Sequence, residues 1–558
     1  MDLSSKRIWP GSKATRDKVQ RINDSIVAQF EQRAGIYREL NAMRPAVNIP
    51  AEILAIIFDF ACWGRSIDPN LFASTVDLEL LELPNSDFSS YGRVPPKTTP
   101  VSIGSVCSAW RNVTLSAPRL WSNIEIRAET RSNSHVEKIA HHLSRSGQHP
   151  LTVEFDPHST SMISTSAHDR LIEEAHRIQT LSLTPASEWD AFINSIANRA
   201  CQLMRLELRE AGSAPRIDNV KFFAKSPKLR EVLLDGFYRM ANVSLPWAQL
   251  ERLDMEGTDI GEFFEPLQLC PCLRTFAFYL TYRGISPYTP TPMTLPSLEV
   301  LEVKTKFEAP LELFLEPLTL PSLRSFSYAV DFGGSSISTL LALISRSACN
   351  LVTLCLAGLM SPNDIAECLS ASPRLRELQL YGMQWHTALD KPVFTKRLLD
   401  LMNPKKYVEQ QQELGPAEGT DDIDSQTSIF HSGTETVLAP GLEKLFFQGQ
   451  ADFDAAYLVE FIADRWNNPV ADFRDPAHVS GPADKVPSSN TAVAVRRLKS
   501  ITFWSTKLTL GEKENFILKK VRLEGMHVDL QNCPLAELCT LADLTWAVDS
   551  DSDSELEF

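Results

Sequence analysis

Three small groups of residues have types and spacings that could support catalysis or metal binding. Asp331–Gly333 spells a triplet that kinases use to hold Mg²⁺, but no glycine-rich loop or His-Arg-Asp motif precedes it. Cys270 and Cys272 are separated by one residue, whereas zinc hairpins need two to four, and no second ligand pair follows. His141 and His142 are neighbours, so on a helix they face different ways. The sequence therefore predicts no catalytic site, no metal and no cofactor, and a protein that is not an enzyme.

Composition and charge narrow the class of partner. The chain has 558 residues and a formal net charge of −15, with a pI near 5.3. General binding to nucleic acid or an anionic membrane needs a basic face, so we expect neither. No apolar run reaches the roughly 18 residues that span a bilayer, and no secretory signal segment is expected. Ten scattered cysteines then indicate reduced thiols and a cytoplasmic and/or nuclear protein.

The element that must position any binding residues is a repeated motif, roughly Leu-x-x-Leu-x-Leu. Its first eight spacings are 21 to 28 residues, within the range of leucine-rich repeats, and the last two are 67 and 56 residues. The first apolar residues of its eleven copies are Ile178, Leu203, Leu229, Leu250, Leu273, Leu298, Leu323, Leu351, Leu375, Leu442 and Leu498.

Each copy predicts a short strand, and the residues between copies predict covering helices. We therefore expect an α/β repeat over residues 126–548, a leucine-rich-repeat solenoid with a curved parallel sheet inside and helices outside. Polar insertions are predicted at 403–436 and 467–493, and residues 549–558 form an acidic tail.

The inner face of such a sheet is the usual binding surface of a repeat array. Residues that alternate with the core leucines should line it, acidic in the first repeats and more aromatic in the last. By this count the substrate-binding candidates are Glu207, Arg209, Asp235, Asp254, Glu256, Tyr279, Glu302, Lys304, Gln379, Tyr381, Phe446, Gln448 and Trp504.

An amphipathic helix is predicted within residues 1–44. Its apolar stripe, which recurs at helical spacing, is Val19, Ile22, Ile26, Phe30, Tyr37, Leu40 and Met43. The stripe spans about four heptads without a clean charge code at its flanks, which favours packing on its own chain over a coiled-coil dimer. Both arrangements remain open from sequence.

The segment from residue 48 to 63, NIPAEILAIIFDFACW, predicts a second helix that is apolar on two sides. Pro50 and Glu52 suit the first turn of a helix over residues 50–62. A second apolar helix near Val106–Val113 can cover one side only. The other side should therefore bind a partner surface.

These two segments resemble the F-box, in the form common among fungal F-box proteins. The segments read IPAEILAIIF and VCSAWRNVTLSAPRLW, with Ile49 where the family has leucine. The resemblance covers residues 45–125, and the intervening 64–100 is an inserted loop longer than the family's spacer. The matching residues, which the resemblance marks as adaptor-binding, are Pro50, Glu52, Ile53, Leu54, Ile57, Phe58, Val106, Cys107, Trp110, Arg111, Pro118, Leu120 and Trp121.

The resemblance to F-box proteins with leucine-rich repeats implies a role. The F-box would dock onto a Skp-family adaptor and, through it, a cullin, while the repeats hold an unidentified protein substrate. The chain would then be the non-catalytic substrate receptor of an SCF-type ubiquitin ligase. It would speed ubiquitin transfer only by holding the substrate near the ubiquitin-conjugating enzyme. The alternative is an F-box and repeat scaffold or regulatory binding protein that directs no ubiquitination.

Overall fold

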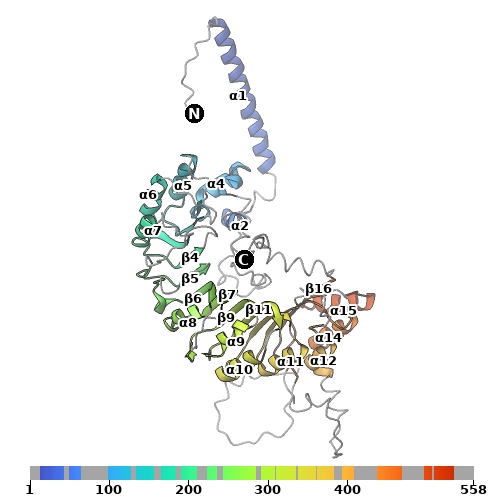
Figure 1. The fold of residues 1–558 in the computed structure, drawn as a ribbon. Helices are drawn as coiled ribbons and strands as arrows, with labels where there is room; N and C mark the ends of the chain where they lie inside the picture. The colour runs from blue at the N-terminus through green and yellow to red at the C-terminus, as the bar shows by residue number, and fades with distance from the viewer. Residues whose placement is uncertain are drawn as a thin grey trace, which may run out of the picture. The chain divides into compact units, whose positions relative to one another are not determined.

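A computed structural model describes most of the chain, which forms two compact units (Figure 1). The described residues are 13–42, 49–63, 99–126, 133–155, 165–183, 190–209, 223–235, 243–259, 261–284, 291–307, 309–334, 337–359, 361–382, 392–406, 437–467, 495–505 and 508–532. The tail 549–558 and nearly all of the insertions predicted at 64–100, 403–436 and 467–493 lie outside them.

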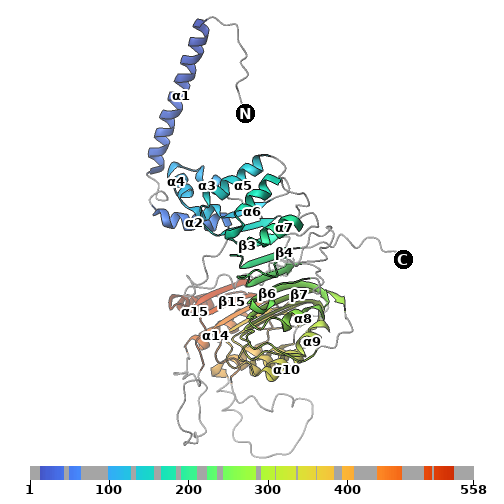
Figure 2. The same cartoon turned by 90° about the vertical axis from the view of Figure 1, so that its left-hand side faces the viewer.

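The N-terminal unit is mainly helical. Its elements are α1 (Lys13–Ala42), α2 (Ala51–Trp63), α3 (Pro100–Gly104), α4 (Ser108–Ser116), η3 (Pro118–Trp121), β1 (Asn123–Ile126), α5 (Asn133–Arg145), β2 (Leu151–Phe155), α6 (Thr165–Glu173) and η4 (Ala175–Arg177). The helix predicted over 50–62 is α2, and the helix predicted within 1–44 is α1. Figure 2 shows α2, α3 and α4 grouped together.

Local sequence explains where the short helices of this unit begin. The Thr99 hydroxyl accepts from the backbone N–H of Ser102, and the Ser102 hydroxyl bonds back, so a capping box starts α3. Pro100 follows at the first helical position, where its missing N–H costs nothing. The Cys107 Sγ accepts from the backbone N–H of Trp110, 3.5 Å away, and begins α4. These caps fix where α3 and α4 begin, and Ile103 and Val113 of the two helices pack in one core with α2.

The C-terminal unit alternates strands and helices. Its elements are β3 (Ile178–Leu183), α7 (Asp190–Ala197), β4 (Arg205–Arg209), β5 (Glu231–Asp235), η7 (Trp247–Gln249), β6 (Arg252–Asp259), α8 (Gly261–Gln268), β7 (Thr275–Gly284), β8 (Met293–Thr294), β9 (Val300–Phe307), α9 (Ala309–Leu315), β10 (Leu318–Thr319), β11 (Ser325–Gly334), α10 (Ile337–Ser347), β12 (Thr353–Leu359), α11 (Pro362–Ala371), β13 (Glu377–Tyr381), α12 (Lys396–Met402), β14 (Lys444–Gln448), α14 (Ala455–Asn467), β15 (Ser500–Ser505), α15 (Glu512–Leu523) and β16 (His527–Asn532).

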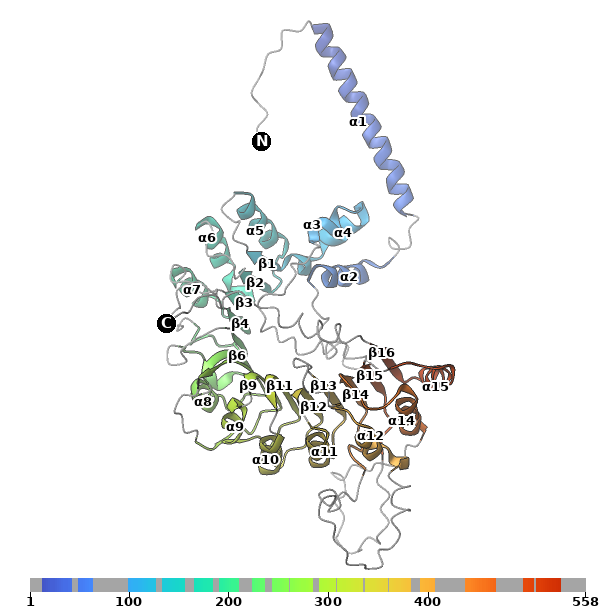
Figure 3. The ribbon, with the colours of Figure 1, turned by 45° about the vertical axis from the view of Figure 1, so that its right-hand side comes forward.

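The described strands, apart from the short pair β8 and β10, form one 14-stranded sheet in chain order. Every neighbouring pair from β3 to β16 is parallel. Figure 3 shows helices α8 to α15 along the outer side of this curved sheet and the strands along its inner side. A long parallel sheet with helices on one side fits the α/β repeat solenoid predicted from the sequence.

The register of the sheet explains the repeated motif. The first apolar residue of all eleven copies is at most 1% exposed. The second apolar residue stacks in one row from strand to strand, so that Leu354 pairs with Phe326 on one side and Leu378 on the other. Leu378 pairs directly with Leu445, and Leu445 with Ile501, although long insertions separate them in sequence. The insertions therefore leave the sheet unbroken.

Long polar side chains satisfy backbone carbonyls where one repeat meets the next. The Arg346 guanidinium donates to the carbonyls of Leu315 and Leu318, both at 2.8 Å. The Gln249 amide donates to the carbonyls of Ser226 and Leu229 at 2.8 and 2.9 Å. A buried carbonyl without a donor is costly, so these bonds allow tight packing of irregular turns.

The continuous core predicts a large effect of truncation within one repeat. Leu380→Ala in β13 removes a fully buried side chain and should lower the free energy of unfolding by about 2–5 kcal/mol. Urea unfolding followed by circular dichroism measures this loss. Leu523→Ala, at a position 80% exposed, is the matched control and should change stability by less than about 0.5 kcal/mol. Equal losses in the two variants would contradict the core assignment.

Candidate protein-binding surfaces

Helix α2 presents an exposed apolar stripe. Ile53, Ile56, Ile57 and Phe60 recur at helical spacing and are 44% to 58% exposed. The opposite side of the helix carries Leu54 and Phe58, which are buried, together with Cys62. The helix is therefore apolar on two sides, as the sequence predicts, and its own unit covers one of them.

The covered side belongs to a compact core. That core consists of Leu54, Phe58, Cys62, Ile103, Val113, Leu120 and Trp121. The Trp110 ring lies 4.9 Å from the Phe58 ring, and the Trp121 indole N–H donates to the Thr114 carbonyl at 2.7 Å. At the rim, Arg119 forms an ion pair with Asp59 at 3.0 Å.

The predicted adaptor-binding residues thus divide into two groups. Leu54, Phe58, Leu120 and Trp121 are buried in the unit's own core, so they support the surface rather than form it. Pro50, Glu52, Ile53, Ile57, Val106, Arg111 and Pro118 are exposed, and Cys107 and Trp110 are half-buried. The family's pattern does not include Ile56, Phe60 and Val101, which are exposed apolar residues on α2 and α3. The i, i+3, i+4, i+7 spacing of Ile53 to Phe60 was the available signal.

The predicted substrate-binding residues fall on two adjacent rows of the sheet. Register aligns Glu207, Asp254, Glu302, Gln379 and Phe446 in one row, with short or apolar residues between some of them. The second row holds Arg209, Asp235, Glu256, Tyr279, Lys304, Tyr381, Gln448 and Trp504. The side chain of Asp235 lies outside the described part of the structure.

Arginine side chains form ion pairs with acidic residues of these rows. Glu207 lies between Arg205 and Arg209, with both nitrogen to oxygen distances at 2.8 Å. Arg252 approaches Asp254 at 2.9 Å. Burial raises the pKa of the Asp254 carboxyl, although the Arg252 guanidinium opposes this shift. The sequence count missed Arg205 and Arg252 because they stand one row earlier.

In the last strands of the sheet, aromatic side chains of the two rows contact one another. The Tyr381 and Phe446 rings are 4.7 Å apart, and the Phe446 and Trp504 rings are 5.6 Å apart. Trp504 donates its indole N–H to Asp529 of β16 at 3.2 Å. Tyr381 and Phe446 are buried, whereas Trp504 is half-buried, so Trp504 is the most accessible of the three. The sequence did not predict Asp529 as an inner-face residue because β16 lacks the full leucine motif.

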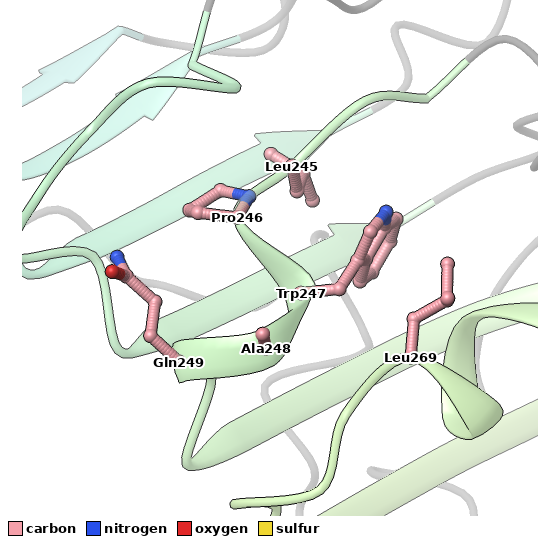
Figure 4. Close-up of a pocket in the computed structure, with 6 residues that line it drawn as sticks. All are labelled: Leu245, Pro246, Trp247, Ala248, Gln249 and Leu269. Carbon is pink, nitrogen blue, oxygen red and sulfur yellow. The ribbon is translucent and has the colours of Figure 1, made fainter.

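A shallow apolar hollow of about 380 Å³ lies beside η7 (Figure 4). Its lining is Leu245, Pro246, Trp247, Ala248, Gln249 and Leu269. Figure 4 shows the Trp247 ring directed toward Leu269, while Gln249 points the other way. The lining carries no charged side chain, so it can hold an apolar group but offers no acid, base or nucleophile.

The three residue groups whose types suit catalysis or metal binding lie in a strand, a turn and a helix. Phe332 of the Asp-Phe-Gly triplet pairs with Phe307 within the sheet. Burial raises the pKa of Cys270 to about 12, so its thiol stays protonated, while Cys272 is exposed. Burial lowers the pKa of His142 to about 4 beside the Trp121 ring. Within the described ranges, no three His, Cys, Asp or Glu side chains converge for a metal ion.

Comparison with known proteins finds only distant similarity. No protein-family model matches the sequence, and no curated protein matches it. Among the solved structures similar to it are two of the Drosophila Toll and Spatzle complex, the second in a glycosylated form. Their identities are 13% and 12%, with TM-scores of 0.27 and 0.19.

These alignments cover 73% and 75% of this chain, which spans 57% and 66% of the two solved chains, less than two thirds of each. The repeat fold therefore rests on the strand order and register of this chain itself. Of the helices that the structure describes, none has the length and apolar character to cross a bilayer.

Replacing the acidic Glu302 by a neutral residue should stabilise the protein, by an amount that depends on pH. Burial raises the pKa of Glu302, because the attraction of Arg252 offsets desolvation only in part and Asp254 repels it. The Glu302 carboxyl therefore binds its proton more tightly in the folded state than in the unfolded state. As pH rises through the folded pKa, the protein loses the stability that this tighter binding contributes. Glu302→Gln should unfold at a higher temperature than wild type at pH 7, and the difference should vanish below about pH 4. A variant less stable than wild type at pH 7 would contradict the account.

Proposed function

We propose that this chain is the substrate-recognition subunit of an SCF-type ubiquitin ligase. Its N-terminal unit would dock, as an F-box, onto a Skp-family adaptor and through it a cullin. The exposed stripe of α2 beside a complete core is the observation that carries the proposal. An apolar stripe of this kind on a small unit marks a protein interaction site.

The resemblance of two separate sequence segments adds to this support. Residues of both segments meet in one helical unit, where Phe58 of the first packs on Trp110 of the second. The exposed residues Ile53 and Ile57, which match the family's pattern, lie in the same stripe as Phe60. The adaptor would therefore contact Ile53, Ile57 and Phe60, while Leu54 and Phe58 hold the helix in place.

The repeat unit would hold the protein substrate. Its inner rows offer ion-paired acidic residues in the early strands and an aromatic series ending at Trp504 in the late strands. The proposed role of these rows is binding, and ubiquitin transfer would be performed by the complex. A cytoplasmic or nuclear location goes with this proposal.

Adaptor capture tests the docking surface. Ile57→Asp places a charge in the proposed interface and should weaken binding to a purified Skp-family adaptor roughly tenfold or more. Met204→Asp is the matched control, because both positions are 45% exposed, and it should bind as wild type does. Circular dichroism would establish that both variants fold. Undiminished capture by a folded Ile57→Asp protein would refute this interface.

Cullin recruitment tests the ligase role. Wild-type chain, adaptor and cullin should co-purify as one complex, and Ile57→Asp should lose cullin and adaptor together. Adaptor bound without cullin would instead indicate a scaffold or regulatory binding protein. That outcome would overturn the ligase role while leaving the docking surface intact.

A further inference from the structure

The half-buried carboxylate of Glu302, on the inner side of β9, has no close partner among the described residues. None of them donates a hydrogen bond to it or forms an ion pair with it. The Arg252 guanidinium attracts it from a distance, but that group is paired with Asp254 at 2.9 Å. A carboxylate that has lost water without gaining hydrogen bonds destabilises the folded state. A cation from outside the chain would supply the interaction that Glu302 lacks.

The positive charges near Glu302 are held on one side of it. Lys304, on the same strand, has its amine 4.9 Å from the centre of the Tyr279 ring of β7. Arg252 lies on β6, the strand beyond β7. Both cations are therefore directed toward the earlier strands, and the side of Glu302 that faces β11 receives neither of them.

Small side chains line the inner face on that other side. Register places Ser327 of β11 beside Glu302 and Cys355 of β12 beside Ser327. Ala329 and Ala357 are neighbours in the adjacent row. The next long side chains are on β13, three strand spacings or roughly 14 Å from Glu302. A long side chain of a partner can therefore lie across this stretch of the sheet.

The far side of the same stretch is also acidic. Glu377 of β13 accepts a hydrogen bond from the Gln379 amide at 2.8 Å and lies 3.4 Å from Lys444. Burial first, and then the charges of Glu302 and Glu377, raise the pKa of the Cys355 thiol between them to about 12. Along the described inner positions of β11 and β12, no basic residue balances this charge. The stretch is therefore complementary to a cation.

We propose that the inner face between Glu302 and Glu377 binds an arginine or lysine side chain of the protein substrate, with Glu302 as its anionic partner. The aliphatic stem would lie over Ser327 and Cys355, and the cation would donate to the Glu302 carboxylate. Because Glu302 is already desolvated in the free protein, the cation gains more from it than from a carboxylate in water. This inference rests on the proposed function in one respect, that the repeats bind a protein.

Peptides selected from a displayed random library by the full-length chain supply the ligand for a test. They should be enriched in arginine or lysine at one position. Replacing that residue by its neutral analogue, citrulline or acetyl-lysine, should weaken binding to wild type about tenfold, and Glu302→Gln should weaken binding of the basic peptide to a similar extent. On Glu302→Gln, the neutral and basic peptides should bind equally, because both changes remove one interaction.

Glu299→Gln is the matched control. It removes the same charge three residues earlier, just before β9, where Glu299 lies 3.6 Å from Arg274. The basic peptide should bind this variant within about twofold of wild type. A loss as large as that of Glu302→Gln would show a general effect of net charge and would overturn the assignment to Glu302.

Three further results would overturn the subsite. They are selected peptides without a basic preference, a neutral analogue that loses the same factor on wild type and on Glu302→Gln, and a folded chain that selects no peptide. Neither adaptor nor cullin takes part in this measurement. Failure of the subsite is therefore distinguishable from failure of the docking surface, which adaptor capture by Ile57→Asp tests separately.

Discussion

Stacking of neighbouring strands is the constraint on which the repeat unit depends. A strand of five or six residues cannot bury its own apolar residues, so each repeat completes the core of the next. Leu354 shows the arrangement, since its core contacts come from the strands on either side, through Phe326 and Leu378. Because each strand needs only its two neighbours, insertions of any length between strands do not interrupt the pairing of the sheet. The same ladder places the alternate residues in rows on the inner face.

The N-terminal unit follows the same physical rule with a different result. Its core is complete once Leu54 and Phe58 pack on Ile103, Val113 and Trp121. The remaining apolar residues of α2 then have no place in that core. A surface of this kind persists in a folded chain when a partner covers it, and the proposed adaptor contact assigns that partner.

Much of the fold could be predicted because it has a period. The first apolar residues of the eleven copies and the rows between them follow from spacing alone. The division of α2 could not be predicted, since Ile53 and Leu54 are equally apolar and only the tertiary packing distinguishes them. The ion pairs of Arg205 and Arg252 depend on which side chains meet across strands, and β16 lacks the leucine motif. These features belong to three-dimensional contact rather than to residue type.

The central claim is that the exposed stripe of α2 is a protein interface. Hydrogen exchange of the full-length chain, measured with and without a Skp-family adaptor, tests it most directly. The account predicts slower exchange in residues 53–60 and 101–106 on adding the adaptor, with the repeat strands unchanged. Adaptor binding that leaves exchange in residues 53–60 unchanged, or no binding by the folded chain, would contradict it.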